Sequence, residues 1–67
     1  MDVVVTGGQF VLHLSREEIG VVRNCVEETL ENVDEAEFVT RMGATRAEVL
    51  LLGDALGDAI GRDVDQT

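Results

Sequence analysis

The sequence has 67 residues, of which 45% are hydrophobic and 28% charged, a composition typical of a folded globular chain. Fourteen acidic residues against five basic ones give a formal net charge of −9, which opposes binding to nucleic acid or to an anionic membrane. A single cysteine excludes an internal disulfide, and one cysteine with one histidine is too few ligands for a structural zinc site.

The small size of the chain predicts a partner. A domain of this length buries only about 60% of the surface of its unfolded chain, so its core is marginal without help. Because disulfides and zinc are excluded, we expect that help from a partner chain, and first of all from a homodimer. No apolar run approaches a membrane span, and an acid, Asp2, stands where a secretory signal carries bases. We therefore expect residues 1–67 to form one cytoplasmic domain.

The first predicted element is a β-hairpin over residues 2–14. Two β-branched or aromatic runs flank the dipeptide Gly7-Gly8, and both glycines can take the positive φ angles of a two-residue turn. Alternation places three apolar side chains of the second run on one face: Phe10, Leu12 and Leu14. A hairpin alone is barely stable in water, so we expect helices to cover it.

An amphipathic helix is predicted next, over residues 16–32. Ser15 and Glu18 form a capping box at its start. Its apolar stripe follows helical spacing: Ile19, Val22, Val26, Leu30 and Val33. Cys25 falls beside this stripe, which favours an inert and partly buried thiol.

Two further helices complete the predicted fold. A short one starts at Asp34 and ends before Gly43, and Thr45 with Glu48 then caps a helix that runs to about Ile60. Gly61 and a polar tail, residues 62–67, finish the chain. The fold class is α+β: a hairpin, then a helical part over residues 15–61 with a long, a short and a long helix. We expect the first and third helices to cover the hairpin.

Three glycines recur every fourth residue in the third helix, at Gly53, Gly57 and Gly61, although each weakens a helix by about 1 kcal/mol relative to alanine. With Leu50 they widen one flank of the apolar arc: Val49, Leu52, Leu56, Ala59 and Ile60. Small residues at this spacing let another backbone approach closely. The flank is predicted either as a self-association surface or as a close contact with the first helix or hairpin of the same chain.

No catalytic, cofactor or metal motif is present, and we expect no enzyme. His13 stands alone on a strand, and Asp54 with Asp58 lacks a third ligand for a metal ion. Residues 37–56 resemble a helix-turn-helix, but Arg46 is the one base that would face DNA among aspartates. A DNA-binding regulator is therefore only a remote alternative.

The predicted function depends on an acidic cluster. It consists of six carboxylates with no base between the first and the last: Glu27, Glu28, Glu31, Asp34, Glu35 and Glu37. Like charges four apart destabilise a helix, and acids are disfavoured at its C-terminal end. A sequence that tolerates this repulsion favours a basic protein partner, although the charge also serves solubility.

The chain resembles a group of short acidic bacterial proteins over about residues 12–52. The matching segments are Leu14-Ser15-Arg16-Glu17-Glu18, Asn24-Cys25-Val26-Glu27 and the stretch 37–45, EFVTRMGAT. Most proteins of this pattern are uncharacterised, and some similar chains are immunity proteins that neutralise a toxin. The resemblance implies no active site. We thus expect an immunity-like or inhibitor-like binding module. The alternative is a small homodimeric regulatory or structural subunit that associates through its glycine flank.

Overall fold

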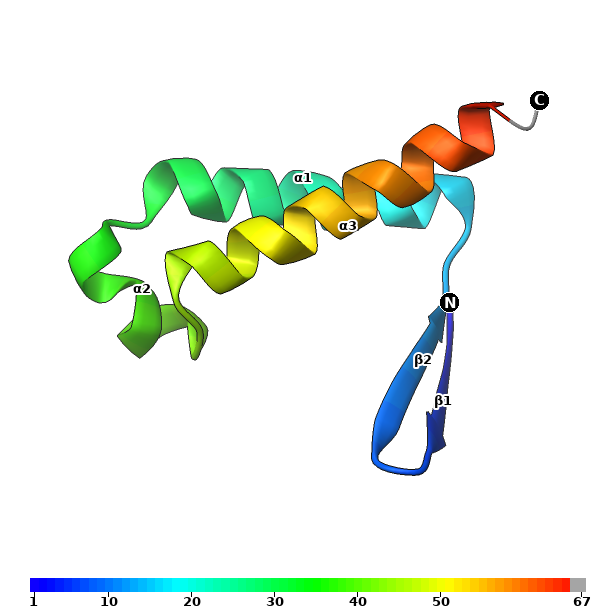
Figure 1. Cartoon of the computed structure of the whole chain (residues 1–67), viewed down its shortest axis with the longest axis horizontal. Coiled ribbons are helices and arrows are strands. Elements are labelled where there is room, and N and C mark those ends of the chain that lie inside the picture. The colour runs from blue at the N-terminus through cyan, green and yellow to red at the C-terminus, as the bar shows by residue number, and fades with distance from the viewer. Residues whose placement is uncertain (66–67) are drawn as a thin grey trace.

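The computed structural model describes residues 1–65. In chain order the elements are β1 (Asp2–Thr6), β2 (Gln9–His13), α1 (Arg16–Asn32), α2 (Glu35–Met42) and α3 (Arg46–Asp65) (Figure 1). The predicted α+β class, with a hairpin before a long, a short and a long helix, is confirmed. Among the described residues, no helix is both long and apolar enough to cross a membrane.

The hairpin forms as the Gly-Gly turn predicts. Gly7 and Gly8 have φ angles of 53° and 80°, which both positions of this tight turn require. The strands pair antiparallel, with Val3 opposite Leu12 and Val5 opposite Phe10. Paired residues share a face, so these four apolar side chains lie together on one side of the ribbon.

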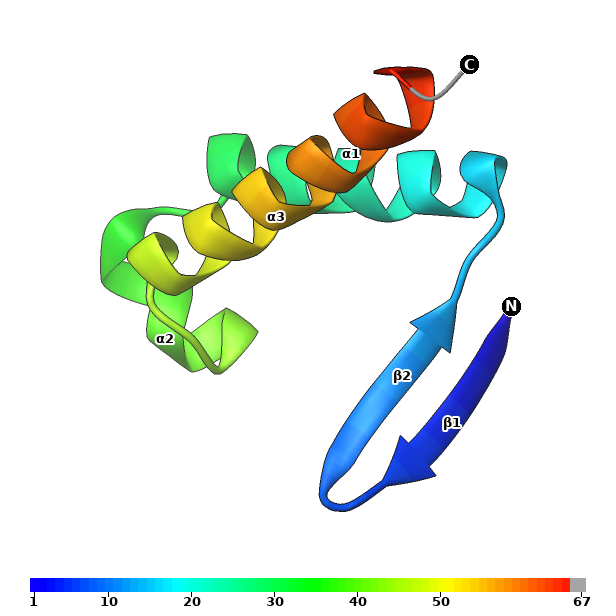
Figure 2. The same cartoon turned by 45° about the vertical axis from the view of Figure 1, so that its right-hand side comes forward.

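The expectation that helices cover the hairpin is wrong. Every residue of β1 and β2 is exposed, and the ribbon projects from the start of α1, away from α1 and α3 (Figures 1 and 2). The cause lies at its base, where Leu14 alone separates β2 from the N-cap Ser15. The Ser15 backbone N–H donates to Glu18 Oε1 at 2.9 Å, and the N-terminal ammonium lies 3.2 Å from Glu18 Oε2. These contacts fix the hairpin at the first turn of α1.

Helices α1 and α3 lie side by side and form the body of the molecule, with α2 turning between them at one end (Figures 1 and 2). The predicted α1 stripe faces this contact and is half-buried: Ile19, Val22, Val26, Leu30 and Val33. Of the described side chains, the buried hydrophobic ones are Phe38 of α2, 1% exposed, and Val49 of α3, 8% exposed. The core is therefore thin and lies at the α2 end.

The helix ends follow local chemistry, with one exception. Both predicted capping boxes form, and Gly43 ends α2 with a φ of 72°, its N–H donating to the Val39 carbonyl. Helix α3, however, continues past Ile60 and Gly61 to Asp65. The predicted tail, residues 62–67, is therefore helical through residue 65, while residues 66 and 67 lie outside the described part.

Candidate functional site

The acidic cluster lies at one end of the molecule. Its members occupy the C-terminal half of α1, the N-cap position of α2 and the first turn of α2, around the bend between these helices (Figure 1). All six side chains belong to exposed residues: Glu27, Glu28, Glu31, Asp34, Glu35 and Glu37. The structure thus brings the predicted acidic residues together in space as well as in sequence.

Half of the cluster has partners within the chain. Glu27 pairs with Arg23 at 3.2 Å, and Glu37 pairs with Arg41 at 3.6 Å. The Asn32 side-chain amide donates to Glu28 at 3.0 Å.

The other half of the cluster lacks such partners. Within residues 1–65, no ion pair or side-chain hydrogen bond engages Glu31, Asp34 or Glu35. The last turn of α1 contains no basic residue, so the carboxylates add to the negative end of the helix dipole. The cluster therefore carries uncompensated negative charge that a cationic surface would meet.

Two of the four residues of the glycine flank pack closely within the chain. A Cβ atom on Gly53 would lie 3.3 Å from Val26 Cγ1, and one on Gly57 would lie 3.6 Å from Arg23 Nε. Gly61 faces open space, and Leu50 is 40% exposed. Both glycines thus face side chains of α1, with close helix packing at Gly53 and ordinary van der Waals contact at Gly57. Self-association through this flank stays a prediction.

An apolar groove runs between α1, α3 and the end of α2, with a volume of about 280 Å³. We call it the apolar groove; its main lining residues are Val22, Cys25, Val26, Met42, Val49 and Leu52. Two expectations fail here, because Cys25 is exposed rather than partly buried and Leu52 is 59% exposed rather than inside. Both side chains lie at the edge of the α1–α3 contact, which no other part of residues 1–65 covers.

A second apolar surface belongs to the hairpin. Its members, here called the hairpin face, are 51–72% exposed: Val3, Val5, Phe10 and Leu12. The opposite side of the ribbon carries Val4 and Val11 between polar residues at both ends. The hairpin is therefore amphipathic, and its apolar side has no cover within residues 1–65.

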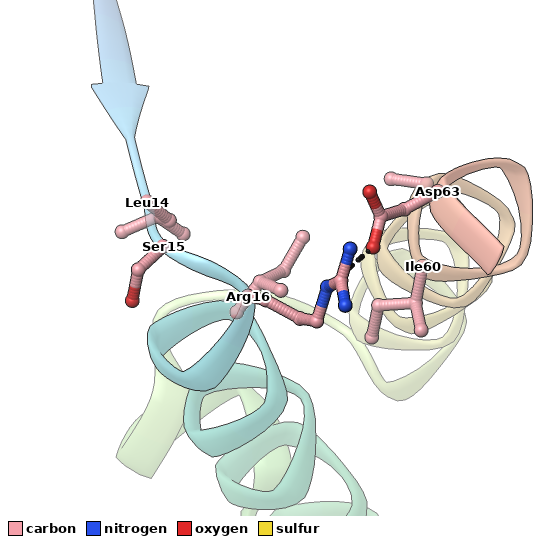
Figure 3. Close-up of a pocket in the computed structure, with 7 residues that line it drawn as sticks. Leu14, Ser15, Arg16, Ile60 and Asp63 are labelled. Atoms are coloured by element: carbon pink, nitrogen blue, oxygen red, sulfur yellow. Dashed lines mark ion pairs between the residues drawn. The ribbon is translucent and has the colours of Figure 1, made fainter. Parts of the chain in front are cut away.

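A smaller cavity of about 190 Å³ lies where the hairpin meets the helices. Leu14, Ile19 and Ile60 supply its apolar wall, and Arg16 reaches from α1 to Asp63 of α3, with Nε 2.7 Å from Oδ2 (Figure 3). This ion pair joins the start of α1 to the extra helical turn of α3. The cavity serves as a structural junction, because its one polar pair is already satisfied.

The remaining candidates are dispersed. His13, Asp54 and Asp58 are exposed, and no group of three metal-ligating side chains occurs within residues 1–65. Arg46, the base that would face DNA, directs its guanidinium to the Leu30 carbonyl at 3.4 Å.

Two glutamates have a lowered pKa. The backbone N–H of Ser15 donates to Glu18 and lowers its pKa, and the backbone N–H of Thr45 does the same for Glu48. Both shifts therefore come from helix capping.

Comparison with known proteins finds no matching family model, no matching curated protein and no matching solved structure.

Proposed function

We propose that the protein is a non-enzymatic binding module of the immunity or inhibitor type, which acts in the cytoplasm and uses the acidic cluster to bind a basic protein. The observation that carries the proposal is the set of exposed carboxylates at the α1–α2 bend that have no partner in the described chain: Glu31, Asp34 and Glu35. The resemblance to short acidic proteins with immunity members supports the same function.

Physical chemistry favours a protein partner with positive charge. A net charge of −9 on so small a chain attracts a basic surface over a Debye length of about 8 Å at physiological salt. The cluster concentrates that field at one end, where it can orient the partner as well as attract it. Val39, one helical turn after Glu35 on α2 and 58% exposed, offers short-range apolar contact after the encounter.

A pair of charge reversals tests this proposal. Glu28→Lys with Glu31→Lys reverses two of the six charges of the cluster, and Asp54→Lys with Asp58→Lys makes the same change in net charge on the exposed side of α3. Wild type and both double variants serve as baits at low salt in an extract of the source cells. A basic protein retained by wild type and by the α3 variant, but not by the cluster variant, is the expected result.

Binding kinetics with that purified protein complete the test. We expect the cluster reversal to slow association by about 10-fold to 100-fold at low salt, and less as salt rises. The α3 reversal should have a much smaller effect. Equal losses in both variants would mean that only net charge matters, and an unchanged association rate in the cluster variant would remove the proposed site.

The second candidate is a small homodimeric regulatory or structural subunit. Its favouring observation is the amount of uncovered apolar surface, which includes Val5 at 66% and Phe10 at 72% exposed. Its predicted contact is the glycine flank, where Leu50 and Gly61 are open to a second chain while Gly53 and Gly57 face side chains of α1. DNA binding remains remote, because Arg46 contacts its own α1.

A further inference from the structure

The described fold exposes more surface than a chain of its mass needs to expose. Its accessible surface is 5285 Å² for 7.3 kDa, whereas a compact monomer of this mass exposes about 4,200 Å². The excess is therefore about 1,100 Å² per chain. Much of it is apolar, because the hairpin is uncovered and the core contains few buried side chains.

The hairpin face and the apolar groove match in size and chemistry. The hairpin face spans about 7 Å along each strand, from Val3 to Val5 and from Phe10 to Leu12. The groove wall from Val22 to Val26 spans about 6 Å along α1. Neither surface contains a charged side chain, although 28% of the chain is charged.

We propose that two copies of this chain form a symmetric dimer in which the hairpin face of each copy packs into the apolar groove of the other. Because each chain carries both halves of the contact, a single two-fold axis satisfies all four surfaces at once. A foreign partner would have to supply both a groove and a hairpin-like face to do the same.

The same chain cannot easily make this contact alone. Leu14 is the whole connection between β2 and the α1 cap, and it lines the junction cavity beside Ile60 (Figure 3). The Ser15–Glu18 capping box holds the backbone of that connection. A hairpin fixed in this way points away from its own α1 and α3, and so leaves its face for a neighbour (Figure 2).

The area agrees with a stable dimer. Two chains together carry about 2,200 Å² of excess surface, and a contact that covered all of it would fall within the range of obligate homodimer interfaces, about 2,000 to 5,000 Å². Charge also favours these surfaces, because two chains of −9 repel each other wherever their carboxylates meet. Neither the hairpin face nor the lining of the groove brings a carboxylate to the contact.

Cys25 provides a direct test, because the single cysteine of the chain is exposed and lines the groove. A chain with Phe10→Cys and Cys25→Ser is mixed with wild type and treated with a mild thiol oxidant. The introduced thiol lies on the hairpin face, so we expect a covalent dimer between the two kinds of chain. Val11→Cys with Cys25→Ser is the matched control, since Val11 points to the opposite side of the ribbon.

The mass of the protein in solution tests the same contact without cross-linking. By sedimentation equilibrium from about 1 to 100 µM, a range that spans ordinary dimer affinities, we expect wild type to be a dimer. Val5→Asp and Leu52→Asp place a charge in the contact and should each weaken the dimer at least about 100-fold, because each change acts twice. Their neighbours Val4→Asp and Leu51→Asp are the controls and should leave the mass unchanged.

Several outcomes would overturn the inference. These are a wild-type monomer throughout the concentration range, equal effects of Val5→Asp and Val4→Asp, and equal cross-linking of the two introduced cysteines. A disulfide within a single Phe10→Cys chain that keeps Cys25 would show that the hairpin folds onto its own groove. An aspartate variant that loses its helical circular dichroism has unfolded and does not test the contact. The cross-linking of Phe10→Cys compared with Val11→Cys then tests it. None of these outcomes bears on the acidic cluster. The experiments therefore test the dimer and the binding of a basic partner independently.

Discussion

Two glutamates determine where the long helices begin. Glu18 accepts from the Ser15 backbone N–H at 2.9 Å, and Glu48 accepts from the Thr45 backbone N–H at 3.1 Å. These N–H groups would otherwise lack a partner in the helix, so each carboxylate satisfies a donor and opposes the positive end of a dipole. The same hydrogen bonds lower the pKa of both carboxyls.

The lowered pKa of Glu18 predicts how the stability of the fold changes as the pH falls. A carboxyl whose folded pKa is lower than its unfolded one stabilises the fold above the unfolded value, about pH 4.3. That contribution is lost as pH falls further, through the folded value. We therefore expect Glu18→Gln to lower the urea midpoint at pH 7 and to have little effect near pH 3. Glu17→Gln removes the same charge from the same turn without touching the capping box.

Urea unfolding at fixed protein concentration, followed by circular dichroism between pH 7 and pH 3, gives this comparison. Glutamine can still accept from the Ser15 backbone N–H, so the excess effect of Glu18→Gln over Glu17→Gln measures what the Glu18 charge adds toward that N–H and the N-terminal ammonium. This excess should shrink as pH falls. Identical curves for the two variants would mean that the charge of Glu18 adds no more than that of any acid in the first turn.

Capping boxes are also what the sequence predicts best, because the residues involved are three positions apart. The edges of an apolar stripe are predicted less well. Cys25 lies at a helical phase next to the half-buried Val22 and Val26, and Leu52 next to the buried Val49, yet both are exposed. Whether such a position is inside depends on the angle between α1 and α3 and on the presence of a further layer, neither of which periodicity encodes.

At the scale of the element, α3 shows two different uses of glycine. At Gly53 a Cβ atom would lie 3.3 Å from Val26 Cγ1, whereas at Gly61 it would meet open space. Gly61→Ala should therefore stabilise the protein by about 1 kcal/mol through helix propensity alone. Gly53→Ala gains the same propensity but presses on the Val26 side chain, which must shift within the α1–α3 contact, so we expect its net effect to be at least about 1 kcal/mol less favourable.

Denaturant unfolding of the two alanine variants at one protein concentration measures this difference. Gly57→Ala should be intermediate, since its Cβ would meet the flexible Arg23 side chain at ordinary contact distance. Equal stabilisation by Gly53→Ala and Gly61→Ala would show that α1 and α3 are not in close contact at Gly53.

The end of α3 and the placement of the hairpin explain why elements are predicted better than their arrangement. Gly61 fits both a helix interior and a helix end, and in the structure the turn beyond it contacts Arg16, a residue distant in sequence, which pairs with Asp63 at 2.7 Å. Alternation predicts that Phe10 and Leu12 share a face, but it does not predict that the helices leave this face uncovered. Its direction depends on the single connecting residue Leu14 and the cap beside it.

At the scale of the whole molecule, the acidic end was predictable and the groove was not. The six carboxylates fall within an eleven-residue stretch from Glu27 to Glu37, so the chain itself keeps them near one another however the helices pack. The groove combines side chains of α1 and α3 with Met42 and Ala44 near the end of α2, so it exists only after the helices have met. The charge of the acidic cluster can be predicted from the sequence directly, whereas the shape of the apolar groove cannot.

The net charge of −9 also destabilises the fold through repulsion among its carboxylates. The dependence of the Tm on salt should measure this effect. Raising NaCl from 10 mM to 1 M shortens the screening length from about 30 Å to about 3 Å, which weakens repulsion among fourteen acids held in one small body. We expect the Tm to rise by about 4–8 °C, which corresponds to about 1 kcal/mol for a chain of this size. A Tm that does not change with NaCl would show that the carboxylates are too well solvated to repel.

The two double reversals locate that repulsion. If it is concentrated at the acidic cluster, Glu28→Lys with Glu31→Lys should raise the low-salt Tm more than Asp54→Lys with Asp58→Lys, although both change the net charge equally. The two should converge in 1 M NaCl, where screening removes the difference. A stability gain specific to the cluster would mean that the native carboxylates are kept at a cost to folding, as a binding surface requires. Equal gains would instead assign the acids to solubility.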